Sequence, residues 1–250
     1  MAVEPWRFCA VVADSTGNTL ASRRLLVKHQ IPLAIMLGDC VHHLNRGIGD
    51  IGKLAAFQSV IQVVRATVAL FHKSHAGHAA LKVARSQLGI GRGLEAIGKT
   101  RFATLVLSAA SVQRNTPAIK KVVNSRAVTF KTIEDYFQVQ STRKTSNFES
   151  GLEQFLCIGL PVAKAIACLE ALDATAADVY IYWHAILYAL GAALTNQRLE
   201  YEGTIIEEVT GIMNARYRQL FEDGNIANDV YLAATYLNPS LSCAFLICSH

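Results

Sequence analysis

The chain has 250 residues, of which 52% are hydrophobic and 17% are charged, and its formal net charge is +5. This much apolar material is enough for a substantial buried core, and it excludes a disordered polypeptide. The mild positive charge is compatible with a polyanionic partner but does not identify one.

Two strands joined by a helix are predicted at the start of the chain. An apolar run over residues 8–13 ends at Asp14, a helix follows over residues 16–28, and a second apolar strand covers residues 33–37. The residues of this helix expected to face inward are Leu20, Leu25 and Leu26. A strand, a helix and a strand in this order predict two parallel strands joined by a right-handed crossover.

Helical periodicity dominates from residue 41 onward. The glycines Gly47, Gly49 and Gly52 weaken the first long helix, which runs to residue 71, and are expected to break it into two. Further helices are expected over residues 79–88, 102–114, 117–124, 149–172, 176–196, 200–221 and 227–237. The polar stretch 126–147 is the predicted linker between a first domain, 1–125, and a second, 148–250.

The segment from Ala176 to Leu194 is apolar for nearly the length of a membrane span. It contains Asp178 and His184, and its aromatic residues are spread along it rather than gathered at its ends. We therefore interpret it as a buried helix of a soluble protein and expect no membrane association.

The N-terminus and the cysteines indicate the compartment. The first eight residues lack a basic segment followed by an apolar one, so no secretion signal is predicted. The six cysteines lie scattered in apolar patterns, which favours buried free thiols over a disulfide framework. These are Cys9, Cys40, Cys157, Cys168, Cys243 and Cys248. We expect a nuclear or cytoplasmic protein that is not secreted.

Two motifs that suggest ligand binding have simpler interpretations. The segment Gly89–Gly93 does not match the spacing of a phosphate-binding P-loop, so it is interpreted as a turn. His72, His75 and His78 recur at steps of three residues, but Gly77 is expected to interrupt any helix there. A solvated helix end is therefore favoured over a metal site for these histidines.

Asp14 is the residue for which a chemical role is a serious hypothesis. Metal-dependent phosphoryl transfer uses several carboxylates on rigid elements to place two magnesium ions. Taken alone, an aspartate followed by Ser, Thr, Gly and Asn is more often part of a turn or a helix N-cap. Both interpretations stay open from the residues alone.

Several blocks of the chain, in the same order, resemble the hAT-type transposase domain of fungal mobile elements. The blocks are Asp14–Thr19, Asp39–Asn45, Lys99–Phe102, Pro117–Ile119, Pro161–Ile166, Asp178–Tyr180 and Tyr231–Pro239. The resemblance implies a mostly α-helical chain with a small ribonuclease-H-like remnant of two parallel strands, followed by a helical insertion domain. It also implies that Asp14 is the second catalytic acid, with Mg²⁺ as the family's metal and DNA as the partner.

The resemblance assigns roles to two further blocks. Cys40 and one of two histidines, His42 or His43, correspond to the pair that braces the core in the family. Four ligands are needed for a closed zinc site, so a packed thiol and a hydrogen-bonded imidazole are preferred. Arg101 and Phe102 stand where the family has Arg-Trp near the DNA ends. Phe102 could stack on an extruded base there, or simply pack in the core.

The first and third acids of the family's metal site are not found in this sequence, and Glu170, Glu207 and Glu208 have no motif support as substitutes. We expect a truncated transposase fragment that does not cleave DNA alone, because one carboxylate does not hold two magnesium ions. The strand before Asp14 would leave a free edge and promote self-association. The alternatives are a domesticated noncatalytic module that binds DNA or protein, and an enzyme whose missing acids come from another chain.

Overall fold

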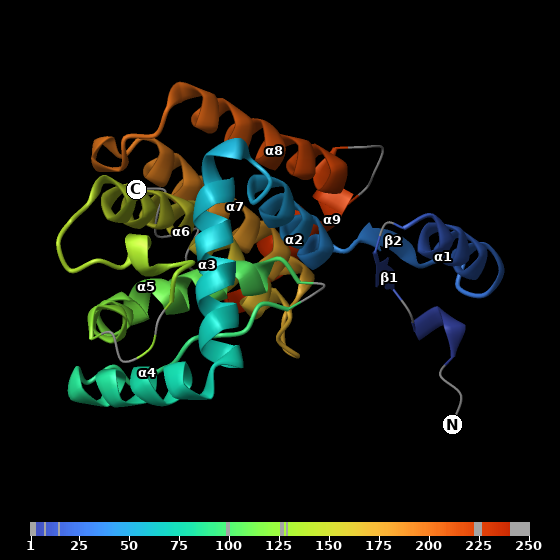
Figure 1. Cartoon of the computed structure of the whole chain (residues 1–250). Helices are drawn as coiled ribbons and strands as arrows, with labels where there is room; N and C mark the ends of the chain where they lie inside the picture. The colour runs from blue at the N-terminus through green and yellow to red at the C-terminus, as the bar shows by residue number, and fades with distance from the viewer. Residues whose placement is uncertain are drawn as a thin grey trace. The chain divides into compact units, whose positions relative to one another are not determined.

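The computed structural model describes residues 4–7, 9–14, 16–98, 101–125, 128, 130–222 and 227–240. As the sequence predicts, the fold is mostly α-helical with two short parallel strands (Figure 1). The strands are β1 (Ala10–Ala13) and β2 (Ile35–Gly38). The helices are α1 (Gly17–His29), α2 (Cys40–Ile51), α3 (Ala55–Lys73), α4 (His75–Gln87), α5 (Ala103–Asn124), α6 (Arg143–Leu169), α7 (Ala176–Leu194), α8 (Gly203–Phe221) and α9 (Ala227–Leu237). Short 3-10 turns cover Pro5–Arg7, Glu134–Tyr136 and Gln197–Leu199.

The chain divides into two compact units, each built from separate stretches of sequence. The first unit comprises Met1–Gly47, Ile166–Ala185 and Gly211–His250. The second comprises Ile48–Ala165 and Ile186–Thr210. The linker expected over residues 126–147 is partly described. It contains a 3-10 turn and buries Phe130, Ile133 and Phe137, and the domain division at this place stays a prediction.

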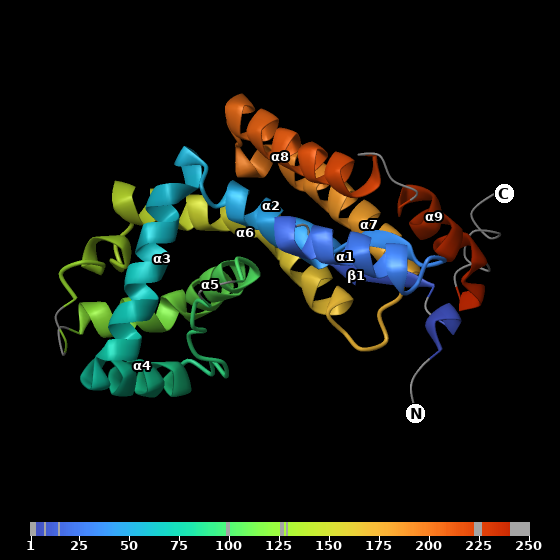
Figure 2. The same cartoon turned by 90° about the vertical axis from the view of Figure 1, so that its right-hand side faces the viewer.

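The two strands of the first unit pair in parallel, with Ala10 opposite Ile35 and Ala13 opposite Gly38. Helix α1 connects them and contacts both, and Figure 2 shows it beside β1. Helix α9 contacts β2, and its Tyr231 hydroxyl donates to the carbonyl of Gly38 at 3.1 Å. The predicted parallel strand-helix-strand arrangement is therefore confirmed.

The inward face predicted for α1 is wrong for two of its three residues, since only Leu20 is half-buried. Leu25 and Leu26 are 59% and 41% exposed, whereas the buried residue of this helix is Arg23. A two-stranded sheet offers too little surface to cover both leucines, and Arg23 gains hydrogen bonds to the strand ends. Val12 of β1 is also 57% exposed. These apolar side chains support the predicted self-association, which stays a prediction.

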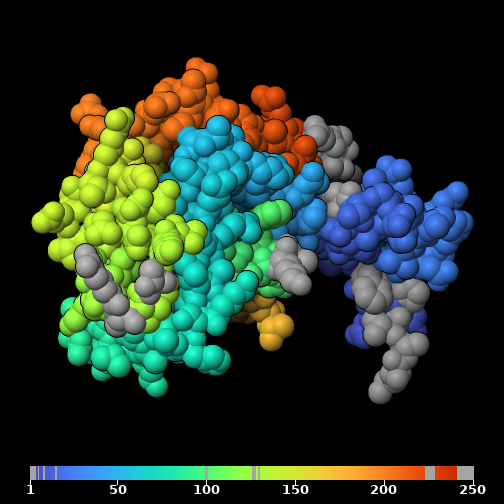
Figure 3. All heavy atoms as spheres, viewed as in Figure 1, coloured from blue at the N-terminus to red at the C-terminus, as the bar shows by residue number. Residues whose placement is uncertain are grey.

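In the second unit, α6 packs closely against α3 and α5. Phe155 is fully buried and its ring lies 5.5 Å from that of Phe57, measured between centroids. Gly151 lies so near α3 that a Cβ atom there would come within 2.7 Å of the Val60 Cγ2. Figure 3 shows α4 beside α3 with its outer side chains open to solvent.

Three predicted helix boundaries differ from the structure. One helix, α5, replaces the two expected on either side of Pro117, because a continuous buried stripe runs through it, from Val112 to Ile119. The break near the histidines falls at Ser74, whose hydroxyl caps α4 by accepting from the Gly77 amide at 3.0 Å. The glycine-rich break after α2 is confirmed, since α2 ends at Ile51. Helix α6 starts earlier than expected, at Arg143.

Among the described residues, three helices are long and apolar enough to cross a membrane by length and composition: α3, α6 and α7. Only 28% of the apolar stretch of α7 is buried. The expectation of a buried helix therefore holds for one face of α7, which includes Trp183. Its placement in a soluble protein stays a prediction.

The cysteines differ from the expectation of buried thiols. Cys40 is buried and Cys157 half-buried, but Cys9 and Cys168 are exposed, and these four are free thiols. Cys243 and Cys248 lie outside the described residues.

Candidate functional site

Two carboxylates follow the paired ends of the parallel strands. Because Ala13 lies opposite Gly38, Asp14 and Asp39 come next on adjacent strands at the same edge of the sheet. Asp39 accepts a hydrogen bond from the His42 amide at 3.2 Å, which caps the start of α2. The carboxyl edge of the sheet thus gathers acidic side chains, and Asp39 has a structural role there.

The Asp14 carboxylate is part of the turn that starts α1. Its Oδ1 accepts from the Thr16 amide at 3.3 Å and from the Thr16 hydroxyl at 3.0 Å, and it also accepts from the Thr19 hydroxyl. These bonds, that of the Thr19 hydroxyl above all, hold the pKa of the Asp14 carboxyl below its usual value. Asp14 therefore stays ionised well into the acid range, with one oxygen already engaged.

Arg23 ties the two strand ends together. Its guanidinium donates to the carbonyl of Leu37 and, at 3.2 Å, to the carbonyl of Asp14. The side chain is only 6% exposed. A buried guanidinium that bonds both strands fixes the backbone from which the Asp14 carboxylate projects.

Cys40 and His43 lie three residues apart on α2, so they share one face of the helix. Both are 5% exposed, whereas His42 is half-buried, so His43 is the histidine buried with the thiol. Burial raises the pKa of the Cys40 thiol, with a smaller contribution from Asp39. The thiol is packed as expected.

The imidazole of His43 differs from the expectation. Its Nδ1 is buried and has no hydrogen-bond partner within the part of the chain that the structure describes. Burial above all, with smaller contributions from His42, Arg216 and Arg46 and against a small opposing effect of Asp39, lowers the pKa of His43 to about 4. The ring is therefore neutral at physiological pH.

This histidine predicts a loss of stability in acid. The unfolded ring takes up its proton near pH 6.5 and the folded ring only near 4, so stability is fully present above 6.5 and decreases as the pH falls toward 4. The loss amounts to about 3 kcal/mol across this window. Urea unfolding at several pH values measures it, and His43→Gln should flatten the curve. His184→Gln, at an exposed histidine of the same unit, should leave it unchanged; equal flattening by both variants would contradict the assignment.

A cavity of about 210 Å³ lies in the first unit beside the strand ends. Its lining includes Val12, Leu37, Asp39, Cys40 and Tyr231. Burial raises the pKa of the Tyr231 phenol, which stays protonated and donates to Gly38. The cavity is largely apolar, and Asp39 is the carboxylate in its lining, whereas Asp14 does not line it.

The residues present do not fit a magnesium site. Among the described residues, no group of three or more His, Cys, Asp or Glu side chains could hold a metal ion. His72 belongs to α3, His75 and His78 belong to α4, and all three are exposed. Asp14 would have to be joined by carboxylates from elsewhere to hold the two ions of a phosphoryl-transfer centre.

Phe102 directly precedes α5 and lies over α2. A Cβ atom on Gly49 would come within 2.7 Å of its ring, so the ring sits directly on this glycine, yet 40% of the residue stays exposed. Core packing therefore accounts for one side of the ring, and base stacking on the other side stays a prediction. Arg101 is exposed, and Lys99 and Thr100 of the same block lie outside the described residues.

The comparisons with known proteins give no match. No family model, no curated protein and no solved structure is similar to this chain.

Sequence reasoning missed Arg23 and Asp39 at the strand ends. Arg23 is one of two adjacent arginines in a polar helix, and nothing in the spacing separates it from Arg24, which is exposed. Asp39 could have been found, since it directly follows the second predicted strand, as Asp14 follows the first. The parallel pairing then places both at one edge.

Proposed function

We propose that this chain is part of a hAT-like DNA transposase, comprising the segment with the second acid and much of the helical insertion. One observation carries the proposal: a parallel strand-helix-strand unit has Asp14 at the end of its first strand, and Cys40 and His43 begin the helix after its second. These residues are the ones that the family resemblance assigns to the core, in the same order.

The chemistry would be metal-dependent phosphoryl transfer at DNA ends. Several carboxylates together would hold the two Mg²⁺ ions of such a site, and the ions would supply Lewis-acid stabilisation of the reacting phosphate. Of those carboxylates, this chain would contribute Asp14, oriented by Thr16 and Thr19. We expect no strand cleavage by the 250 residues alone.

A noncatalytic module that binds DNA or protein is the second candidate. The observation that favours it is the local engagement of Asp14, whose Oδ1 is already bonded to the turn and to Thr19. A carboxylate that serves mainly to start α1 needs no metal. An enzyme completed by a second chain is a third candidate, and it would require Asp14 to turn toward incoming acids.

The test combines a cleavage assay with the genomic DNA on both sides of the reading frame. Supercoiled plasmid incubated with the chain and Mg²⁺ should stay intact, and nicking that survives Asp14→Ala would contradict the role of Asp14. If a strand-rich segment with the first acid lies upstream and a helix with the last acid downstream, the joined reading frame should cleave DNA.

In that joined protein, Asp14→Asn should lower the cleavage rate by at least about 100-fold, because the site loses a metal ligand. Asp173→Asn removes an exposed carboxylate of the same unit and is the matched control. Full activity of the Asp14→Asn protein would refute the proposal, and the absence of both flanking segments would favour the noncatalytic module.

A further inference from the structure

Charge is unevenly distributed along this chain. Residues 51 to 133 contain thirteen lysines and arginines but a single acid, Glu95, although the net charge of the whole chain is only +5. The remaining residues hold eleven basic and eighteen acidic side chains. The basic stretch lies entirely in the second unit and forms α3, α4, α5 and the segments between them.

Helices α4 and α5 pack against each other in an antiparallel pair. Near the start of α4, a Cβ atom on Gly77 would come within 3.0 Å of the Phe130 ring, and Phe130 follows the end of α5. At the other end of α4, Arg85 reaches the segment that Asn115 of α5 also contacts. The end of α4 and the middle of α5 therefore meet the same segment, and the two helices are in contact (Figure 1).

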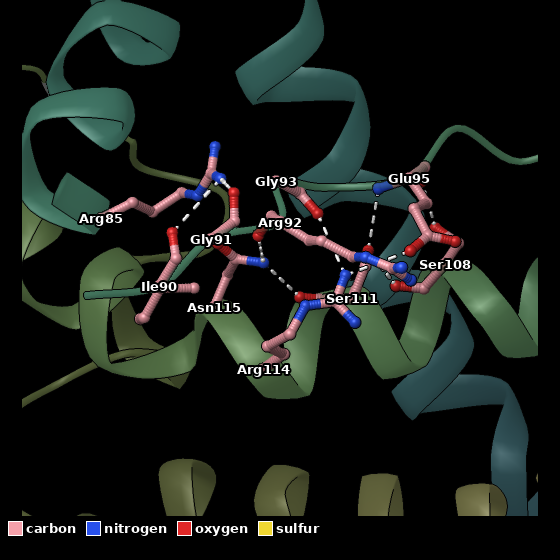
Figure 4. A network of polar contacts seen from close by, with 10 residues as sticks. All are labelled: Arg85, Ile90, Gly91, Arg92, Gly93, Glu95, Ser108, Ser111, Arg114 and Asn115. Atoms are coloured by element: carbon pink, nitrogen blue, oxygen red, sulfur yellow. Dashed lines mark hydrogen bonds and ion pairs between the residues drawn. The ribbon is translucent and has the colours of Figure 1, made fainter. Parts of the chain in front are cut away.

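Side chains of both helices hold the glycine-rich segment between them (Figure 4). Arg85 donates to the carbonyls of Ile90 and Gly91, and Asn115 donates to the carbonyl of Arg92 at 3.2 Å. Arg114 donates to the carbonyl of Gly93 at 3.3 Å and to the Glu95 carboxylate at 3.1 Å. Four consecutive carbonyls thus bond to α4 and α5, so this segment is an ordered part of the surface.

Three cations at this surface have no protein partner among the described residues: Lys82, Arg92 and Lys121. All three are exposed. Lys82 lies one turn before Arg85 on α4, and Lys121 lies two turns after Arg114 on α5. Each therefore shares a helix face with an arginine that bonds the segment, and Arg92 belongs to the segment itself.

The amides of the segment are equally free. Within the described chain, the N–H groups of residues 91 to 94 make no hydrogen bond, whereas the carbonyls of residues 90 to 93 do. N–H groups without a partner in the described chain, in a segment that carries Arg92, are donors that suit phosphate oxygens.

We propose that α4, the segment 88–98 and α5 form a binding surface for the phosphodiester backbone of double-stranded DNA, with Lys82, Arg92 and Lys121 as phosphate contacts. The choice of DNA rests on the proposed function, but the surface itself does not. A membrane is a poorer fit, because Leu81 and Ala84 of α4 are buried, and only Val83 and Leu88 remain as large apolar side chains exposed on this helix and at its end. Binding would be independent of base sequence, since contacts to the phosphodiester backbone carry no sequence information.

The experiment measures the affinity of the whole chain for a 20-base-pair duplex by fluorescence anisotropy at several salt concentrations, with EDTA present. Each lost phosphate contact lowers the slope of log K against log salt by about 0.9, so the variant Lys82→Gln, Arg92→Gln and Lys121→Gln should lower it by about 3. Its affinity at 0.1 M salt should fall at least tenfold. EDTA keeps the result independent of any metal chemistry at Asp14.

The matched control removes three other exposed cations without partners among the described residues, Arg24, Lys28 and Lys164, also by replacement with glutamine. It should keep the slope and the affinity, and both variants should melt like the unaltered chain. Equal losses in the two variants, or no salt-dependent binding at all, would overturn the proposal. Equally tight binding of polyglutamate or of anionic vesicles would overturn the choice of DNA.

Discussion

Replacing Phe155 by alanine is expected to destabilise the second unit by about 3–5 kcal/mol. Phe155 is fully buried in α6, and its ring packs against that of Phe57 in α3. The alanine would lose this ring contact and leave a cavity in a region where helices approach too closely to collapse further. Urea unfolding measures the loss, and Lys164→Ala, on the exposed side of the same helix, is the control.

The close approach itself can be tested at Gly151. Alanine normally stabilises a helix relative to glycine by about 1 kcal/mol, but here its Cβ would lie 2.7 Å from the Val60 Cγ2. We therefore expect Gly151→Ala to destabilise the chain and Val60→Ala to relieve the clash when the two are combined. Gly191→Ala, in α7 with nothing within 4 Å, should stabilise it. Stabilisation by both glycine replacements would contradict the close approach of α6 to α3 at Gly151.

The parts of the fold that follow from local patterns could be predicted. An apolar run, an amphipathic helix and a second apolar run indicate a parallel pair, and the strands Ala10–Ala13 and Ile35–Gly38 confirm it. Pro117 is predicted to start a helix, because proline lacks the amide that a helix interior uses. It lies within α5, where tertiary packing on both sides of it outweighs the lost hydrogen bond.

Burial was harder to predict than secondary structure. Hydrophobic spacing placed Leu25 and Leu26 inside, but the surface available to α1 is a two-stranded sheet, and both remain exposed. Conversely, a charged residue became the buried one, since Arg23 finds two backbone acceptors. Which polar side chain will meet an acceptor depends on tertiary structure, and no spacing in the sequence encodes it.

The candidate site likewise has a part that the sequence predicts and a part that it does not. Asp14 at the end of a strand could be found, because an apolar run ends there. Its bonds to Thr16 and Thr19 are local, and the turn interpretation anticipated bonds of this kind. The lack of a hydrogen-bond partner for the His43 Nδ1 among the described residues could not be predicted, because it depends on which residues pack against α2 in the tertiary structure.

Arg23→Met is expected to lower the free energy of local opening at the strand ends by about 2–4 kcal/mol, since the carbonyls of Leu37 and Asp14 each lose a donor. The loss should be local, because the helices of the second unit do not depend on this residue. Amide hydrogen exchange measures it directly: protection of β2 and of the start of α1 should fall.

Arg24→Met is the matched control, since Arg24 is the exposed neighbour on the same helix. It should leave exchange in the strands unchanged. If the two variants exchange alike, Arg23 does not hold the strand ends. If only Arg23→Met exchanges faster, the turn that carries Asp14 depends on a buried arginine, and the orientation of this carboxylate is set by α1 as well as by the strand before it.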